Sequence, residues 1–203
     1  MKIVCIGRNY ADHISELANQ RPADPVIFMK PDTALLPDGQ AFVIPEFTDN
    51  VHYEVELVVK ISKYGKHINP EFVSSYYDEI GLGIDFTARD EQDKLKEKGL
   101  PWEKAKAFDG SAVVAKFLPK SNFGSVDDIN FSLNKNKLQV QSANASLMLW
   151  KIDELIVYVS KFFTLRKGDL LFTGTPAGVG KVNSGDVLEG FIENKTLFKT
   201  RIL

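Results

Sequence analysis

Alternating apolar and polar positions predict more β-strands than helices along this chain. The clearest strand is expected at 53–61, where every second side chain is apolar. The opposite face of that strand carries two glutamates, Glu54 and Glu56, together with Val58 and Lys60. Shorter apolar runs bounded by turn residues predict further strands at 3–6, 26–29, 42–44, 80–86, 129–133, 137–141 and 196–202, with a hairpin turn at 134–136. Two Gly-Asp steps, at 168–169 and 185–186, each precede an apolar run that predicts another strand.

Helical periodicity is limited to a few segments. Apolar side chains recur near helical spacing across 151–163 and predict a packed helix there. A helix is expected at 9–19, with Ile14 and Leu17 as its apolar pair, and a polar helix at 90–98; Asn69-Pro70-Glu71 predicts the start of a short one. The strands outnumber these helices and do not alternate regularly with them. We therefore expect an α+β fold with a mixed, curled sheet rather than a doubly wound α/β fold.

The composition excludes several classes of protein. The chain has 203 residues, of which 44% are hydrophobic and 26% are charged, as in globular domains. No internal repeat or linker divides it, so we expect a single domain over residues 1–203. The net charge of −2 gives no reason to expect a nucleic acid or an anionic membrane as partner. Cys5 is the only cysteine, which excludes intrachain disulfides and favours a cytoplasmic location.

The two glutamates of the 53–61 strand are the first candidates for chemistry. Glu54 and Glu56 are expected to point the same way, about 7 Å apart by the rise per residue of a strand. Two carboxylates on an otherwise apolar strand are unfavourable unless something compensates their charge. A hard divalent cation could be bound by both. A solvent-facing edge strand is the simpler interpretation, and this pair alone leaves it open.

Asp85 lies near the end of a second apolar strand, whose two glycines permit close approach of a ligand or another segment. It could complete a site of three carboxylates with Glu54 and Glu56, or it could cap the helix that follows. Carboxylates without His or Cys suit Mg²⁺ or Mn²⁺ better than zinc or copper. Three such ligands would leave positions open for substrate oxygens.

Two further pairs have helical spacing and could act on a substrate. His13 and Glu16 are three residues apart, so Glu16 could orient the imidazole and raise its basicity. Arg89 and Gln92 have the same spacing at the start of another helix, where they could bind a carboxylate or carbonyl oxygen. Each pair could instead belong to a solvated helix face.

Lys106 lies between two alanines, an unusually apolar setting for a lysine. A buried lysine requires a negative partner, such as the carboxylate cluster or an enolate. A side chain that extends its charge to the solvent is the alternative.

The segment 173–181 is rich in glycine but fails the spacing of a nucleotide-binding P-loop. Thr175 and Val182 stand where that motif requires glycine and a Ser or Thr. Gly174 and Thr175 could still offer a backbone amide and a hydroxyl to an anion, although a plain tight turn would have the same sequence.

Six short segments, taken together and in order, resemble the fumarylacetoacetate hydrolase superfamily, in particular its short acylpyruvate hydrolase and oxaloacetate decarboxylase branch. They are GRNYADH (7–13), HYEVEL (52–57), DFTARD (85–90), GLPW (99–102), AKAF (105–108) and TGTP (173–176). The resemblance covers almost the whole chain. It implies a β-roll with flanking helices and a homodimeric assembly.

The resemblance also implies a metal centre and a catalytic pair. Glu54, Glu56 and Asp85 would ligate Mg²⁺ or Mn²⁺ as the cofactor. His13 and Glu16 would form the catalytic pair on a lid helix that becomes ordered when substrate binds.

The same resemblance implies how the substrate is held. Lys106 would stabilise developing negative charge. The groups that would hold substrate oxygens are Arg89, Gln92, Gly174 and Thr175.

The predicted reaction follows from these ligands. A small 2-oxo acid would chelate the metal, which would polarise the 2-oxo group. We expect hydrolysis of a small acylpyruvate, in which His13 and Glu16 activate water and a pyruvate enolate leaves. The same enolate would serve oxaloacetate decarboxylation or tautomerisation of a 2-oxo acid, which are the alternative activities. A non-catalytic metal-binding interaction protein is a more remote hypothesis.

Overall fold

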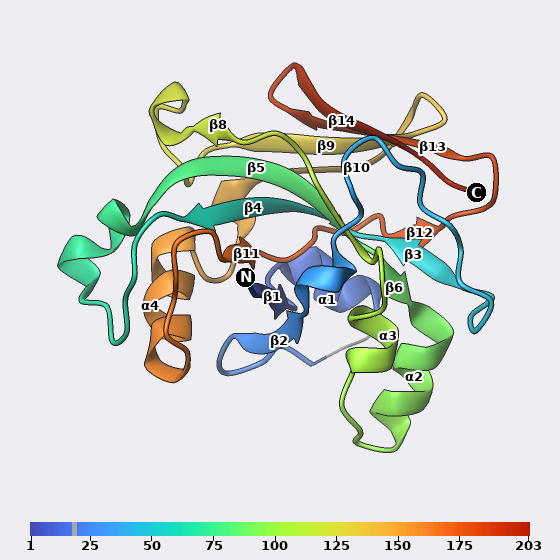
Figure 1. Ribbon diagram of the computed structural model, residues 1–203, viewed down its shortest axis with the longest axis horizontal. Helices are drawn as coiled ribbons and strands as arrows, with labels where there is room; N and C mark the ends of the chain where they lie inside the picture. The colour runs from blue at the N-terminus through green and yellow to red at the C-terminus, as the bar shows by residue number, and fades with distance from the viewer. Residues whose placement is uncertain (18–19) are drawn as a thin grey trace.

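A mixed β-sheet lies at the centre of the computed structural model, which describes residues 1–17 and 20–203 (Figure 1). Its strands are β1 (Ile3–Gly7), β2 (Val26–Lys30), β4 (Val55–Ile61), β5 (Tyr77–Asp85), β7 (Ala112–Val114), β8 (Leu118–Pro119) and β11 (Leu170–Phe172). The order is β2-β1-β11-β4-β5-β7, and β8 also pairs with β5. The sheet is mixed because β1 and β11 are parallel, whereas β1–β2, β11–β4 and β4–β5 are antiparallel.

A second, antiparallel sheet packs over the central one (Figure 1). Its strands are β9 (Asn130–Lys135), β10 (Leu138–Asn144), β13 (Val187–Ile192) and β14 (Lys195–Arg201), in the order β10-β9-β13-β14. The two sheets approach closely at Gly190, where a Cβ atom would lie 2.8 Å from Cδ2 of Leu82. A larger residue here would have to displace the Leu82 side chain and the Phe198 ring of β14, so glycine permits this close approach.

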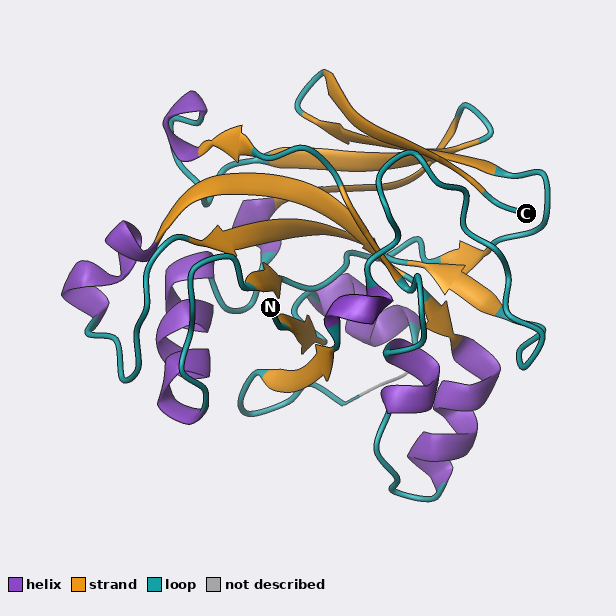
Figure 2. Ribbon diagram, viewed as in Figure 1, coloured by secondary structure: helices purple, strands orange, loops and turns teal. Residues whose placement is uncertain are grey.

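A third, small sheet and the helices complete the architecture. The small sheet contains β3 (Val51–Tyr53), β6 (Thr87–Ala88) and β12 (Gly180–Lys181). The α-helices are α1 (Ala11–Glu16), α2 (Arg89–Glu97), α3 (Glu103–Lys106) and α4 (Ile152–Phe162). Short 3₁₀ helices span Asp32–Ala34, Pro70–Tyr76, Lys120–Asn122 and Ala145–Leu147. In the view of Figure 2, helices α1–α4 lie below the long central strands and the second sheet lies above them.

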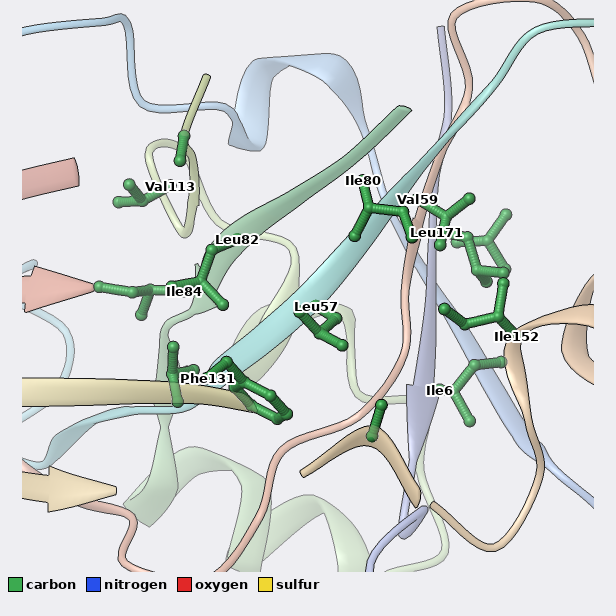
Figure 3. Packing of buried hydrophobic residues seen from close by; sticks show 14 of the residues in the cluster. Ile6, Leu57, Val59, Ile80, Leu82, Ile84, Val113, Phe131, Ile152 and Leu171 are labelled. Carbon is green, nitrogen blue, oxygen red and sulfur yellow. The ribbon is translucent and has the colours of Figure 1, made fainter. Parts of the chain in front are cut away.

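The apolar faces of both sheets and of α4 form a continuous core. Leu57 and Leu82 of the central sheet, Phe131 of the second sheet and Ile152 of α4 belong to one buried cluster (Figure 3). All four side chains are at most 2% exposed. Burying a side chain of this size contributes about 1.5–3 kcal/mol to stability. The core therefore fixes the strands that carry the site described below.

The predicted α+β class with a mixed, curled sheet is confirmed. The packed helix expected at 151–163 is also found, because Ile152, Leu155, Ile156 and Val159 form its buried face. Among the described residues, no helix combines the length and the apolar character needed to cross a membrane.

Several expected boundaries are wrong. Residues 42–44 form no strand, and only Phe42 makes a bridge, with Ile202. The strand expected at 53–61 is interrupted at Glu54, which separates β3 from β4. The helix expected at 9–19 covers Ala11–Glu16, and positions 18–19 of that prediction lie outside the described residues.

The hairpin turn lies later in the chain than expected. Asn136 and Lys137 occupy the turn with φ angles of 53° and 70°. Two successive positive φ angles are typical of the tight turns whose twist matches the strands that they connect.

Candidate active site

Three carboxylates meet where the central strands end. Glu54 lies in the break before β4, Glu56 lies on β4, and Asp85 is the last residue of β5. The antiparallel pairing places Glu56 opposite Gly83, and the backbone N–H of Asp85 donates to the carbonyl of Glu54 at 2.9 Å. One oxygen of each carboxylate lies within 4.8 Å of the others. All three side chains are buried, so this is no solvated edge strand.

Mutual repulsion and burial shift the charges of this group. Burial and the charges of Asp85 and Glu54 raise the pKa of Glu56 well above its usual value. Burial also acts to raise the pKa of Glu54, but the positive charges of Lys106 and Arg89 outweigh it and hold that pKa well below its usual range. The carboxyl groups of the triad therefore differ in their pKa values. Glu54 favours its charged form, whereas Glu56 is stabilised by proton binding when no further cation is near.

Lys106 lies against two of the carboxylates. Its ammonium group donates to Glu54 Oε2 at 2.8 Å, to Asp85 Oδ2 at 2.7 Å and to the hydroxyl of Thr87 at 2.6 Å. Burial acts to lower the pKa of Lys106, but Asp85 and Glu54 raise it above its usual value. Lys106 therefore stays charged, and it has the carboxylate partners that its apolar setting in the sequence led us to expect.

Lys30 is a second buried lysine, and the sequence did not single it out. Its ammonium nitrogen lies 2.7 Å from Asp85 Oδ1 and donates to the hydroxyl of Ser111 at 2.9 Å. It also donates to the backbone carbonyl of Lys106. Its position directly after the apolar run 26–29 was the signal that could have marked it, because a lysine that ends a buried strand needs an anionic partner.

Arg89 and Gln92 begin helix α2 and form a buried pair. The Arg89 guanidinium donates to Gln92 Oε1 at 2.6 Å and also to Oε1 of Glu54. The structure thus joins these two residues to the carboxylate cluster, where Arg89 offsets the charge of Glu54.

His13 and Glu16 form the pair that their spacing predicts. The His13 Nδ1 atom lies 3.1 Å from Oε2 of Glu16, and the other carboxylate oxygen accepts from the backbone N–H of Gly178 at 2.9 Å. His13 is 6% exposed. Burial lowers the pKa of His13, although the charge of Glu54 and the hydrogen bond to Glu16 act in the opposite direction. The imidazole is therefore neutral near neutral pH, as a general base must be.

The glycine-rich loop supports the site from behind. The backbone N–H of Gly174 donates to Oε2 of Glu56 at 2.7 Å. The Thr175 hydroxyl donates to the carbonyl of Val55 at 2.9 Å and accepts from Gln141 Nε2 at the same distance. In this structure the Gly174 amide and the Thr175 hydroxyl therefore form hydrogen bonds with other protein groups. Gln141 is a further residue of this site that sequence patterns missed.

One small cavity, with about 30 Å³ of accessible space, brings most of these groups together. Eight of the ten candidate residues line it: His13, Glu54, Glu56, Asp85, Arg89, Gln92, Lys106 and Thr175. Glu16 and Gly174 lie behind this lining and contact it through His13 and Glu56.

The donor set fits a hard divalent cation. Carboxylate oxygens are the ligands that Mg²⁺ and Mn²⁺ prefer. Burial is the largest cause of the raised pKa of Glu56, and repulsion by the charges of Asp85 and Glu54 adds to it. A divalent ion at the centre of the triad would remove that repulsion.

Comparison with known proteins agrees with the fold and with the family that the sequence motifs resemble. The model of the fumarylacetoacetate (FAA) hydrolase C-terminal family matches residues 2–202. The chain therefore belongs to the fumarylacetoacetate hydrolase family, whose members include enzymes that act on 2-oxo acids.

Two curated relatives are described as oxaloacetate tautomerases. The Escherichia coli enzyme YcgM is 44% identical over 203 residues, covering 100% of this chain and 92% of that protein. The mitochondrial enzyme FAHD1 of Bos taurus is 40% identical over 200 residues, covering 98% of this chain and 90% of that protein. Since that relative is mitochondrial, the cytoplasmic location expected from the sequence stays a prediction.

A solved structure with a bound metal is also similar. The fumarylpyruvate hydrolase of Pseudomonas aeruginosa, in complex with Mn²⁺ and pyruvate, superposes with a TM-score of 0.94 at 36% identity. The match covers 100% of this chain and 89% of that one.

Proposed function

We propose that this protein is a divalent-metal-dependent enzyme that interconverts the enol and keto forms of oxaloacetate. The observation that supports this most is the buried triad Glu54, Glu56 and Asp85, which shares one cavity with Lys106 and His13. The descriptions of the Escherichia coli and Bos taurus relatives favour tautomerisation over the hydrolysis that the sequence led us to expect first.

The three carboxylates would hold Mg²⁺ or Mn²⁺. The Mn²⁺ complex of the Pseudomonas relative supports a divalent ion as cofactor. When bound, the ion would supply Lewis-acid polarisation of the 2-oxo group, which acidifies the neighbouring C–H bond.

Tautomerisation moves one proton between the enol oxygen and the carbon next to the carbonyl group, with no other net change of bonding. His13 would exchange the proton at carbon, because its lowered pKa keeps it neutral and Glu16 fixes its Nδ1 atom. Lys106 would offset the negative charge that develops on oxygen. Arg89 and Gln92 would hold the carboxylate next to the 2-oxo group.

Hydrolysis of a small acylpyruvate is the second candidate. The likeness to the Pseudomonas fumarylpyruvate hydrolase favours it, and a neutral His13 held by Glu16 could also activate water. Oxaloacetate decarboxylation would use the same enolate. The homodimer and the small 2-oxo acid as binding partner stay predictions.

The test follows the loss of the enol ultraviolet absorbance of oxaloacetate with Mg²⁺ or Mn²⁺, against the spontaneous rate. We expect the wild-type protein to accelerate the conversion and Glu16→Gln to lower kcat by about 100-fold while keeping its circular dichroism spectrum. Parallel assays measure pyruvate release from oxaloacetate, acetylpyruvate and fumarylpyruvate. Faster hydrolysis than tautomerisation would favour the second candidate, and inactivity in all assays with bound Mn²⁺ would contradict the proposal.

A further inference from the structure

Two cations in the lining of the cavity have no assigned role. Arg8 and Lys96 are partly buried and line the same cavity as the carboxylate triad. The triad's own ion pairs are with Lys106, Lys30 and Arg89. Within the part of the chain that the structure describes, neither Arg8 nor Lys96 has a carboxylate oxygen within 4.0 Å.

The backbone holds Arg8 in an unusual conformation. Its φ angle is 61°, in the left-handed region that residues other than glycine rarely adopt. The next residue, Asn9, fixes this turn from inside the protein, because its amide nitrogen donates to the carbonyls of Thr173 at 2.7 Å and Trp150 at 3.1 Å. Its Oδ1 accepts from the backbone N–H of Trp150 at 2.9 Å. Strain that is maintained by such anchoring is typical of functional positions.

Trp102 fixes Lys96 over the cavity. The ammonium nitrogen of Lys96 lies 5.9 Å from the centre of the indole ring, a cation–π distance. The same ring would contact a Cβ atom at Gly7, at 3.8 Å, so it lies beside the residue that precedes Arg8. The indole therefore links the end of β1 to the end of α2.

The two cations repel each other. Burial and the positive charges of Arg89 and Arg8 lower the pKa of Lys96, although Asp93 on the same helix acts against this. The described lining of the cavity carries four cationic side chains, Arg8, Arg89, Lys96 and Lys106, against three carboxylates. A divalent ion would add further positive charge. An anion with more than one negative charge is therefore the ligand that this cavity favours.

We propose that Arg8 and Lys96 form a subsite for the second carboxylate of a dicarboxylic 2-oxo acid. The triad and Arg89 then hold the 2-oxo acid end, and Arg8 with Lys96 selects substrates that carry a distal negative charge. This inference rests on the proposed function for the identity of the reacting end, and it extends that function to substrate selection. Nothing in the carboxylate triad itself distinguishes oxaloacetate from pyruvate.

The test measures binding to the Mn²⁺-loaded protein by calorimetry with two unreactive ligands. Racemic malate and racemic lactate share the 2-hydroxy acid end, and only malate has a distal carboxylate. We expect the wild-type protein to bind malate about tenfold more tightly than lactate, as one charged hydrogen bond would give. Lys96→Gln and Arg8→Gln should bring this ratio close to one and leave the affinity for lactate unchanged.

Lys98→Gln is the matched control, since Lys98 directly follows α2, is exposed and lies outside the cavity lining. It should keep the wild-type ratio. The KM for oxaloacetate gives a second readout, which should rise in Lys96→Gln with little change in kcat. Should Arg8→Gln fail to fold, Lys96→Gln decides.

The outcomes separate the subsite from the reaction. A wild-type protein with no preference for malate, including one that binds neither ligand, overturns the subsite, and so does an unchanged ratio in Lys96→Gln. A preference for malate that depends on Lys96, in a protein that does not tautomerise oxaloacetate, supports the subsite and contradicts the proposed function.

Discussion

Gln141 holds the backbone of Val55, the residue between the site glutamates Glu54 and Glu56. Its Oε1 accepts from the Val55 N–H at 2.9 Å, and its Nε2 donates to the Thr175 hydroxyl at 2.9 Å. Thr175 in turn donates to the carbonyl of Val55. The backbone N–H and C=O of Val55, at the start of β4, are therefore both hydrogen-bonded to side chains. This closed set of hydrogen bonds fixes the directions of Glu54 and Glu56.

Replacing Gln141 should weaken metal binding more than folding. Gln141→Leu removes every hydrogen bond of this side chain, and we expect the Mn²⁺ affinity to fall by about 10- to 100-fold, as outer partners of metal ligands do. Gln141→Glu keeps the acceptor for the Val55 N–H but loses both N–H donors, so the Mn²⁺ affinity should fall by less than in Gln141→Leu. Titration calorimetry with Mn²⁺ measures the effect, with thermal unfolding alongside it.

Gln139→Glu is the control for Gln141, because Gln139 lies on the same strand and is exposed. Equal Mn²⁺ affinities for wild type and Gln141→Leu would show that Gln141 has a structural role only.

Lys30 should contribute strongly to stability. Lys30 is 1% exposed and its ammonium group lies against Asp85, so Lys30→Met leaves that carboxylate with fewer partners in a buried setting. We expect the free energy of unfolding to fall by about 3–5 kcal/mol, as when one partner of a buried ion pair is removed. Urea denaturation of the metal-free protein measures it.

Lys60→Met provides the comparison. Lys60 pairs with Glu79 at the same 2.7 Å, but both side chains are 41% exposed. We expect Lys60→Met to lower the free energy of unfolding by less than about 1 kcal/mol. Similar losses for the two variants would contradict a buried, charged Lys30.

The activity should persist at pH values where an ordinary histidine is already protonated. Burial lowers the pKa of His13, so its neutral, basic form survives below the usual value of about 6.5. The acid limb of kcat/KM should therefore lie below that value. In Glu16→Gln the residual activity should show a limb at still lower pH, because the hydrogen bond and the charge of Glu16 both raise the pKa of His13.

A profile of kcat/KM from acidic to neutral pH tests this expectation with Mn²⁺ kept saturating. An acid limb above the usual histidine value, or an upward shift in Glu16→Gln, would contradict the assignment of His13 as the base.

The sequence predicted the parts of this site that depend on local pattern. Alternation located the strand that carries Glu56, and helical spacing placed His13 beside Glu16. The break at Glu54 escaped the pattern because the next residue, Val55, is bound by Gln141, which is 86 positions further along the chain. A regular alternation of apolar residues gives no sign that a side chain from another sheet takes the place of a strand's backbone hydrogen-bond partners.

The residues that were missed share this dependence on distant contacts. Lys30 is 55 positions before Asp85, and its role became visible only when the two strands were placed together. Arg8 directly follows β1 and Lys96 lies on α2, and the two have no periodic relation in the sequence. Gly174 was expected to offer its amide to an anion, and the group that it meets in the structure is the carboxyl group of Glu56.

The most direct test of the account is a crystal structure of the protein grown with Mn²⁺ and measured for anomalous scattering. We predict one strong peak between Glu54, Glu56 and Asp85, at about 2.0–2.3 Å from an oxygen of each. Lys106 should then have turned away from the centre of the triad while staying near Asp85 or the ligand. A peak elsewhere, or no peak at a saturating Mn²⁺ concentration, would contradict the account.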